Sequence, residues 1–337
     1  MVSRVAGNGG AEDPRLLAPK HALEIANYSL GTIGNGCTAS GSRVAVITLN
    51  TRESSEFGEF SAFVNGVYTH KHGYDYIEER CVPDTVHLYG GDPMTKYNFA
   101  KAEILLEHLP HYEYLAYLDS DAYFHDFDQT IEAFVDSTLR TGADIIVGQD
   151  CMVHGACWNP TLNTGVLFVR RSAGALMVLR EWAVAMREGG FCHPWDKMDH
   201  AEQGCLRILV NNVPEINATV HMLSSSSSPS ERDVFTINSQ VGSYVTHMVS
   251  CYGECRRGRL QFAMQRVLQE QFGMDLRDRT DQATECTTLL HISNSVLEME
   301  RGHLYHIPDG SRTIDTMRGA IHTLAELARC PGYTKRI

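Results

Sequence analysis

The sequence is poor in basic residues, in cysteine and in long apolar runs, and each shortage excludes a class of protein. Lys and Arg number 29 against 41 Asp and Glu, a formal net charge of −12, so a surface for nucleic acid or anionic membranes is not expected. Ten Cys in 337 residues are too few for a disulfide scaffold, and their pairing is left open. No apolar run approaches the ~18 residues of a membrane span, so we expect no span in this chain.

The beginning of the chain, MVSRVAGNGGAEDPR, lacks the apolar core of a signal peptide. Two compartments therefore stay open. If an anchor or leader has been trimmed away, we expect the Golgi or another secretory lumen, and otherwise the cytoplasm. The formal glycosylation sequons at Asn27 and Asn217 favour a secretory lumen weakly, and the sequence indicates no oligomeric state.

The composition that is present, 43% hydrophobic and 21% charged, is that of a globular protein with a sizeable core. Residues 1–42 are rich in Gly, Asn, Ser and Pro around one short helical stretch, His21 to Leu30, so we expect an N-terminal extension. One large domain is expected over residues 43–312. A C-terminal helix, Ile314 to Arg329, lies within a final segment of residues 313–337.

Strand-like and helix-like segments alternate along this domain, which predicts an α/β fold with a mixed sheet flanked by helices. The expected strands are Arg43 to Leu49, Tyr74 to Ile77, Thr85 to Tyr89, Tyr114 to Leu118, Asp144 to Gly148, Leu162 to Arg170, Thr219 to Leu223, Tyr244 to Val249 and Thr288 to Ile292. The expected helices are Phe57 to His72, Tyr97 to Leu109, Ile131 to Leu139, Ala173 to Arg187, Ala201 to Asn211 and Leu260 to Phe272. Open α/β sheets bind ligands beyond the carboxyl ends of their strands, so polar residues at those ends are the candidates for a site.

The sharpest candidate is Asp119-Ser120-Asp121, directly after the hydrophobic strand Tyr114 to Leu118. Carboxylate oxygens are the ligands that Mg²⁺ and Mn²⁺ prefer, and a metal here would neutralise a substrate diphosphate. One alternative is a solvated turn in which Asp caps a helix starting near Phe127. Another is a haloacid-dehalogenase-type phosphohydrolase, whose motif continues with a small residue and then Thr or Val, whereas Tyr123 follows Ala122 here.

Around these aspartates the chain resembles the nucleotide-sugar glycosyltransferases of the GT-A fold. Within them it resembles glycosyltransferase family 34, which includes fungal α-galactosyl- and α-mannosyltransferases and plant xyloglucan xylosyltransferases. The resemblance runs from about Tyr68 to about Cys255 and rests on six landmarks in the family's order. The landmarks are YTHKHGYDY at Tyr68 to Tyr76, Phe99-Ala100-Lys101, Asp119-Ser120-Asp121-Ala122, Leu162-Asn163-Thr164-Gly165, Glu202-Gln203 and Tyr244-Val245-Thr246-His247.

The resemblance implies a single Rossmann-like GT-A domain with a mixed, mainly parallel central sheet. It implies a retaining glycosyltransferase that moves a sugar, galactose or xylose being favoured, from a UDP-sugar to an acceptor hydroxyl on a glycan. The metal, Mn²⁺ or Mg²⁺, would be held by Asp119, Asp121 and His247, with His291 as the rival imidazole. A sugar-binding or scaffolding protein that lost turnover is the alternative from another class.

The resemblance also places further residues around the donor substrate. Those expected at the nucleoside and the diphosphate are Thr48, Asn50, Arg52, Asp119 and Ser120. Gln149 and Asp150 follow another strand and are expected at the donor or the acceptor sugar.

Several of the landmark residues have a structural explanation as well as a functional one. Lys101 is either a solvated helix lysine or a cation that meets phosphate or sugar oxygens. Asn163 is expected among the catalytic residues, and Thr164 and Gly165 are expected to bind the donor. Gly165 either marks a β-bulge or lets a sugar approach the backbone. Glu202 suits a helix N-terminus through the macrodipole.

Two mechanisms are considered for the transfer. In the preferred one, the amide of Gln203 lies on the β face of the donor sugar and stabilises positive charge at the anomeric carbon, and the acceptor attacks from the front face. In the variant, Glu202 is a covalent nucleophile, and trapping a glycosyl adduct on Glu202 would exclude the preferred route.

The chain departs from the family pattern at positions that bear on the identity of donor and acceptor. The family's Asn before the Tyr68 region is Val64 here, or is displaced to Asn65. Tyr252-Gly253-Glu254 stands where xylosyltransferases have a Lys between two cysteines, and Arg256 and Arg257 follow as possible substitutes. One of two acids before the Gln is Ala201.

Overall fold

The computed structural model of the chain describes residues 42–50, 54–79, 93–139, 142–150, 161–187, 190–192, 201–223, 243–248, 251 and 253–272. The predicted elements at His21 to Leu30, Thr85 to Tyr89, Thr288 to Ile292 and Ile314 to Arg329 lie outside these residues, as do Arg52 and His291. The proposed domain boundaries therefore stay predictions. None of the helices in the described residues is long and apolar enough to cross a membrane.

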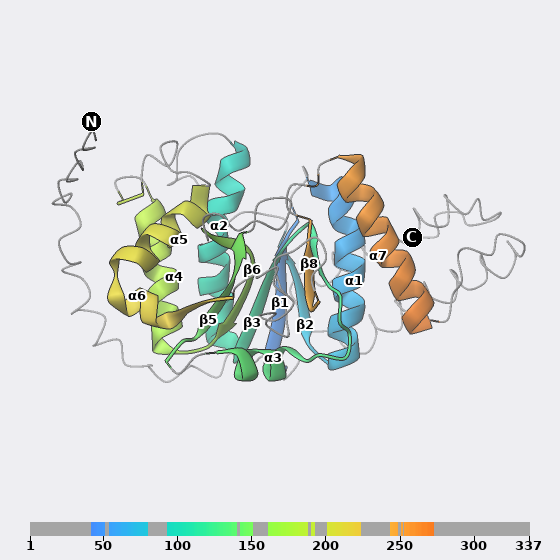
Figure 1. Cartoon of the computed structure of the whole chain (residues 1–337), viewed down its shortest axis with the longest axis horizontal. Helices are drawn as coiled ribbons and strands as arrows, with labels where there is room; N and C mark the ends of the chain where they lie inside the picture. Colours follow the sequence, from blue (N-terminus) through green and yellow to red (C-terminus); the bar gives the residue numbers. More distant parts are fainter. Residues whose placement is uncertain are drawn as a thin grey trace, which may run out of the picture.

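A six-stranded sheet forms the centre of the fold, in the order β2-β1-β3-β6-β5-β7 (Figure 1). Its strands are β1 (Val44–Leu49), β2 (Asp75–Glu79), β3 (Tyr114–Asp119), β5 (Ile145–Asp150), β6 (Thr161–Arg170) and β7 (Val220–Leu223). Three neighbouring pairs are parallel, and β6 runs antiparallel to both β3 and β5. The predicted α/β fold with a mixed, mainly parallel sheet is confirmed.

Helices cover both faces of this sheet. The helices are α1 (Ser55–His72), α2 (Pro93–His108), η5 (Leu109–His111), α3 (Ile131–Thr138), α4 (Ala173–Met186), α5 (Ala201–Asn212), α6 (Pro214–Thr219) and α7 (Glu254–Phe272). In Figure 1, α1 and α7 lie on one side, and α2, α4 and α5 on the other. Because side chains alternate along a strand, Val44 and Val46 join the core under α1, while Ala45 and Ile47 join the core under α2.

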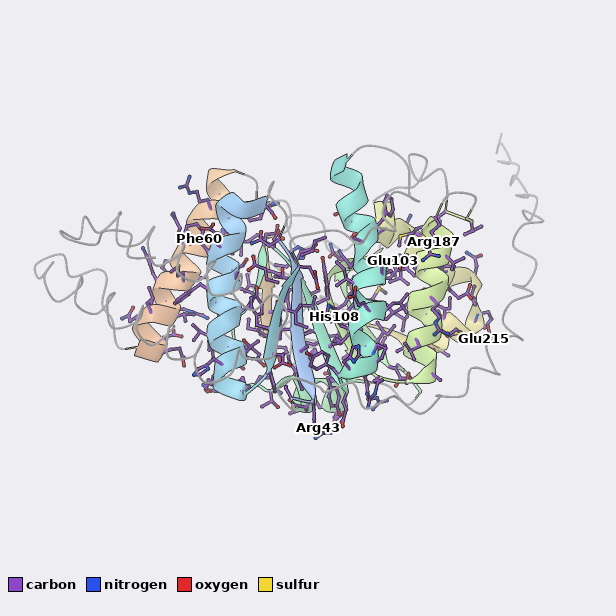
Figure 2. All side chains as sticks on the ribbon, turned by 180° about the vertical axis from the view of Figure 1, so that it is seen from behind. Arg43, Phe60, Glu103, His108, Arg187 and Glu215 are labelled. Carbon is purple, nitrogen blue, oxygen red and sulfur yellow. A yellow bond between two sulfur atoms is a disulfide. The ribbon has the colours of Figure 1, made fainter. Side chains whose placement is uncertain are left out.

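The side with α2 and α4 is also tied together by charge. Arg187, directly after α4, lies with its guanidinium 2.6 Å from the carboxylate of Glu103 in α2 (Figure 2). The side chain of Glu103 is largely buried, so the pair is better shielded than a surface salt bridge, whose contribution is ~0–1 kcal/mol.

A second sheet has two strands. It pairs β4 (Ala122–Phe124) with β8 (Val245–His247) in antiparallel register, with Ala122 opposite His247. The buried amide of Asn65 in α1 fixes β4: its Nδ2 donates to the carbonyl of Ala122 at 3.0 Å, and the N–H of Phe124 donates to its Oδ1 at 3.1 Å. The sequence predicted a strand at Tyr244 to Val249 but not its short partner β4.

The structure also decides one alternative for the two aspartates. No helix begins near Phe127; the next helix, α3, begins at Ile131 and is capped by the Thr130 side chain, which accepts from the N–H of Ala133. The interpretation of Asp119 or Asp121 as a helix cap is therefore wrong.

Candidate active site

Asp119, Asp121 and His247 converge where the two sheets meet. Asp119 ends β3, Asp121 precedes β4, and the β4–β8 pairing brings His247 to them. His247 Nε2 lies 3.2 Å from Asp121 Oδ1 and 3.9 Å from Asp119 Oδ2. One ligand atom from each residue falls within 4.8 Å of the others, and this is the only such group among the described residues. Two carboxylates and an imidazole suit a Mn²⁺- or Mg²⁺-sized cation, so the donor set fits the metal that was predicted.

Backbone contacts hold this triad in place. The N–H of Met248 donates to the carbonyl of Asp121 at 3.1 Å, which continues the pairing beyond β8. The hydroxyl of Ser61 in α1 donates to the carbonyl of Ser120. The turn between the two aspartates is thus fixed from both sides.

The charges within the triad are mutually dependent. Burial lowers the pKa of His247, but the neighbouring Asp121 and Asp119 outweigh this effect and raise it above its usual value. Burial raises the pKa of Asp121, yet His247 and Arg256 bring it below its usual value. Without a metal, His247 and Asp121 therefore stabilise each other's charged forms.

Arg256, in the first turn of α7, contacts the same aspartate from the other side. Its Nε lies 3.1 Å from Asp121 Oδ2 and donates to the carbonyl of Cys251 at 2.8 Å. Its guanidinium lies 4.8 Å from the ring of Phe57, a cation–π distance. Of the two arginines that follow the cysteines, Arg256 belongs to the site, and Arg257 is exposed.

Lys101 is not a solvated helix lysine, because its side chain is only 2% exposed. Its ammonium lies 3.1 Å from both Asp119 Oδ1 and Glu202 Oε1 and donates to the carbonyl of Thr164 at 2.9 Å. Glu202 Oε1 also accepts from the Thr164 hydroxyl at 2.9 Å, and the carbonyl of Glu202 accepts from the indole of Trp182 at 2.9 Å. The landmark lysine, threonine and glutamate thus form one buried network.

Gly165 lies directly beneath the triad. A Cβ at this position would be 2.1 Å from His247 Cε1 and 2.8 Å from Asp119 Oδ2. The missing side chain therefore makes room for the metal ligands, and the approach of a sugar to this backbone stays a prediction. Asn163 supports this part of β6, since its Oδ1 accepts from the N–H of Gly165 at 2.8 Å.

The β-bulge explanation of this glycine is also borne out by the strand pairing. Gly148 of β5 pairs with Asn163, but the preceding Val147 pairs with Leu167, so residues 164–166 of β6 have no counterpart in β5. Bulges of this kind redirect side chains next to active sites. Here the irregular segment carries both Thr164 and Gly165.

The other candidate residues differ in burial and in their hydrogen bonds. Thr48 and Gln149 are buried near the ends of β1 and β5, Ser120 is partly exposed, and Gln203 is partly exposed in the first turn of α5. Asn50 is buried against Gly58, donates to Glu78 Oε1 at 2.8 Å and accepts from the hydroxyl of Ser54 at 2.9 Å. These bonds give Asn50 a structural role, and its contact with a nucleoside stays a prediction. The side chain of Asp150 lies outside the described residues.

Two disulfides, which the sequence left open, border the site. Cys192 and Cys205 are linked with a Cα–Cα distance of 5.7 Å, and Cys205 lies in α5 with Glu202 and Gln203. Cys251 and Cys255 are linked at 5.5 Å, next to Arg256. The short spacing of Cys251 and Cys255 was the one signal in the sequence that could have indicated the second bond.

A sequence profile of the galactosyl transferase GMA12/MNN10 family matches residues 62–257, a segment that contains the triad, the Lys101 network and Arg256. No curated protein sequence matches the chain.

Three solved structures illustrate its similarity to known folds. A glycosyltransferase involved in glycosylation of the major capsid of PBCV-1 is 18% identical, with 65% of this chain and 98% of that chain covered and a TM-score of 0.45. The galactosyltransferase LgtC, solved with donor and acceptor sugar analogues, is 12% identical, with 65% and 95% covered and a TM-score of 0.42. Mouse xyloside xylosyltransferase 1 is 12% identical, with 53% and 84% covered and a TM-score of 0.33.

Proposed function

This chain belongs to the galactosyl transferase GMA12/MNN10 family, glycosyltransferase family 34, and from that premise we propose a specific reaction for it. The protein is a glycosyltransferase with a GT-A fold. The proposed reaction moves galactose or xylose from a UDP-sugar to an acceptor hydroxyl on a glycan, depends on Mn²⁺ or Mg²⁺, and retains the anomeric configuration.

The observation that carries the proposal is the convergence of Asp119, Asp121 and His247 within 4.8 Å at the carboxyl end of β3. These three residues would hold the cation, which supplies positive charge to the diphosphate that leaves as the glycosidic bond breaks. Arg256 reinforces the same region, because its guanidinium carries a permanent charge beside Asp121. With the cation bound, positive charge would gather where the proposed reaction develops negative charge.

The contacts of Glu202 favour front-face attack over the covalent route. Its Oε1 is engaged by the ammonium of Lys101 and by the hydroxyl of Thr164, and the residue is 5% exposed. Both contacts involve Oε1, and they give the buried carboxylate of Glu202 a structural role that does not require it to attack a sugar. In our proposal Glu202 anchors α5, and the amide of its neighbour Gln203 stabilises the positive charge on the sugar.

Sugar transfer with a donor panel tests the proposal. The purified protein is incubated with UDP-galactose, UDP-xylose, UDP-glucose or GDP-mannose and with glycan acceptors, with Mn²⁺ or with a chelator, and the released nucleotide is measured. We expect release of UDP from one of the first two donors only with metal, and an α-linked product by NMR.

The Asp121→Asn variant serves as the inactive reference. Loss of transfer in this variant, with nucleotide release from the unaltered protein, supports the assigned site. Nucleotide binding without transfer in the unaltered protein would favour the sugar-binding alternative. Metal-dependent phosphate release from simple phosphomonoesters would instead revive the phosphohydrolase.

A further inference from the structure

Lys101 joins four separate elements at the edge of the metal-binding triad. From α2, its ammonium contacts Asp119 Oδ1 at the end of β3, Glu202 Oε1 in α5 and the carbonyl of Thr164 in β6, at 3.1, 3.1 and 2.9 Å. A fourth acceptor, the hydroxyl oxygen of Thr164, lies 3.3 Å from the ammonium, so its three protons are all engaged within this network. Contact with a diphosphate or a sugar would require one of these bonds to break.

Asp119 is held from a second direction by its own strand. Tyr117, two residues earlier in β3 and 2% exposed, lies on the same face of the strand, and its phenol is close to the carboxylate of Asp119. A phenol hydroxyl can donate a hydrogen bond to a carboxylate, which only accepts. The Tyr117 ring also lies 5.0 Å from the Lys101 ammonium. Lys101 and Tyr117 are therefore next to each other as well as next to the carboxylate of Asp119.

We propose that Lys101 and Tyr117 are positioning residues that orient the carboxylate of Asp119 for the metal. Lys101 occupies Oδ1, which leaves Oδ2, the oxygen 3.9 Å from His247 Nε2, directed at the centre of the triad. Asp119 itself is the most exposed member of the triad, with 34% of its side chain accessible, so its orientation depends on these two partners. The inference rests on the metal site of the proposed function and adds two residues to it.

Two physical effects predict opposite results when the lysine charge is removed. An ammonium this close to a metal ligand repels a divalent cation, so electrostatics alone predicts tighter metal binding in Lys101→Met. Loss of orientation predicts weaker binding, since removing the partner that orients a metal ligand typically lowers metal affinity ~10–100-fold. The direction of the change therefore separates a positioning role from a bystander charge.

The experiment measures Mn²⁺ affinity by electron paramagnetic resonance of the free ion, which requires no catalysis. Lys101→Met and Tyr117→Phe are compared with the unaltered protein, and Lys71→Met, an exchange of a partly exposed lysine on α1, is the matched control. We expect Mn²⁺ binding weakened about 10–100-fold in Lys101→Met, weakened severalfold in Tyr117→Phe, and unchanged in the control.

Tyr117→Phe keeps the volume and the net charge of the site, so it tests the proposal even if Lys101→Met does not fold. Mn²⁺ affinity equal to or tighter than that of the unaltered protein, in either folded variant, overturns the proposal for that residue. Failure of the unaltered protein to bind Mn²⁺ would instead refute the metal site of the proposed function.

Discussion

Replacing Gly165 by alanine should disable the metal site while leaving the fold in place. The new Cβ would lie 2.1 Å from His247 Cε1, whereas carbon atoms in contact are ~3.5 Å apart, so the imidazole must move by about 1.4 Å. Metal sites tolerate deviations of only ~0.2 Å. His247 cannot move freely, because it is 5% exposed and pairs with Ala122 through β8.

The expected magnitudes follow from these distances. An extra methyl group in a packed site costs ~1–3 kcal/mol of folding free energy, which lowers the melting temperature by a few degrees for a domain of this size. Mn²⁺ affinity should fall by a factor on the order of 100 or more, beyond the usual effect of a lost supporting contact.

Isothermal titration with Mn²⁺ and a thermal melt in chelator measure the two effects separately. Gly258→Ala is the control, because a Cβ there meets nothing within 4 Å on α7, and alanine should stabilise that helix by ~0.5–1 kcal/mol. If folded Gly165→Ala binds Mn²⁺ as tightly as the unaltered protein, the imidazole of His247 is not a ligand, and the reasoning is refuted.

Three further changes have defined outcomes. Asn65→Ala removes both amide bonds to β4 and should lower the free energy of unfolding in urea by about 2–4 kcal/mol, whereas Asn212→Ala at an exposed position should change it little; equal effects would contradict the role of Asn65. Cys255→Ser opens the five-residue loop beside Arg256. This change should lower the free energy of unfolding by about 2 kcal/mol and weaken UDP binding in the presence of Mn²⁺. Unchanged UDP affinity would show that the disulfide does not contribute to the site. Asp121 and Asp119 raise the pKa of His247, so its ion pairs stabilise the metal-free protein fully below pH ~6.5, and this stability is lost as the pH rises through the raised pKa. The difference in free energy of unfolding in urea between the unaltered protein and His247→Gln should therefore shrink from pH 6 to pH 9. A difference that grows over this range would contradict the ion pair.

The sheet and most helices could be predicted because their signals are local. Strands such as Tyr114–Asp119 are short apolar runs, and α4 follows a clear helical period with Ser172 as its cap. The elements that were missed have weak signals: β4 has three residues and α6 has six. The helix α7 begins six residues before the predicted start at Leu260, because its first turns, ECRRGR, are polar and contain a glycine.

The site was only partly predictable because its contacts join distant parts of the chain. Two aspartates after a buried strand indicate a metal on local grounds, but His247 could be selected only from the family resemblance, since the β4–β8 pairing brings it there. For Lys101, helical periodicity left a solvated lysine open, and only the tertiary arrangement shows a buried ammonium with acceptors from three other elements. The position of Gly165 under the imidazole likewise required the folded geometry.

A thermal-shift measurement with UDP tests the central claim, a divalent cation held by Asp119, Asp121 and His247 that binds the diphosphate. Ligand at 100 times its dissociation constant stabilises a protein by ~2.7 kcal/mol. We expect UDP to raise the melting temperature of the unaltered protein only when Mn²⁺ is present, and to have no effect on Asp121→Asn under either condition. Equal stabilisation by UDP with and without metal, or in Asp121→Asn, would contradict the account.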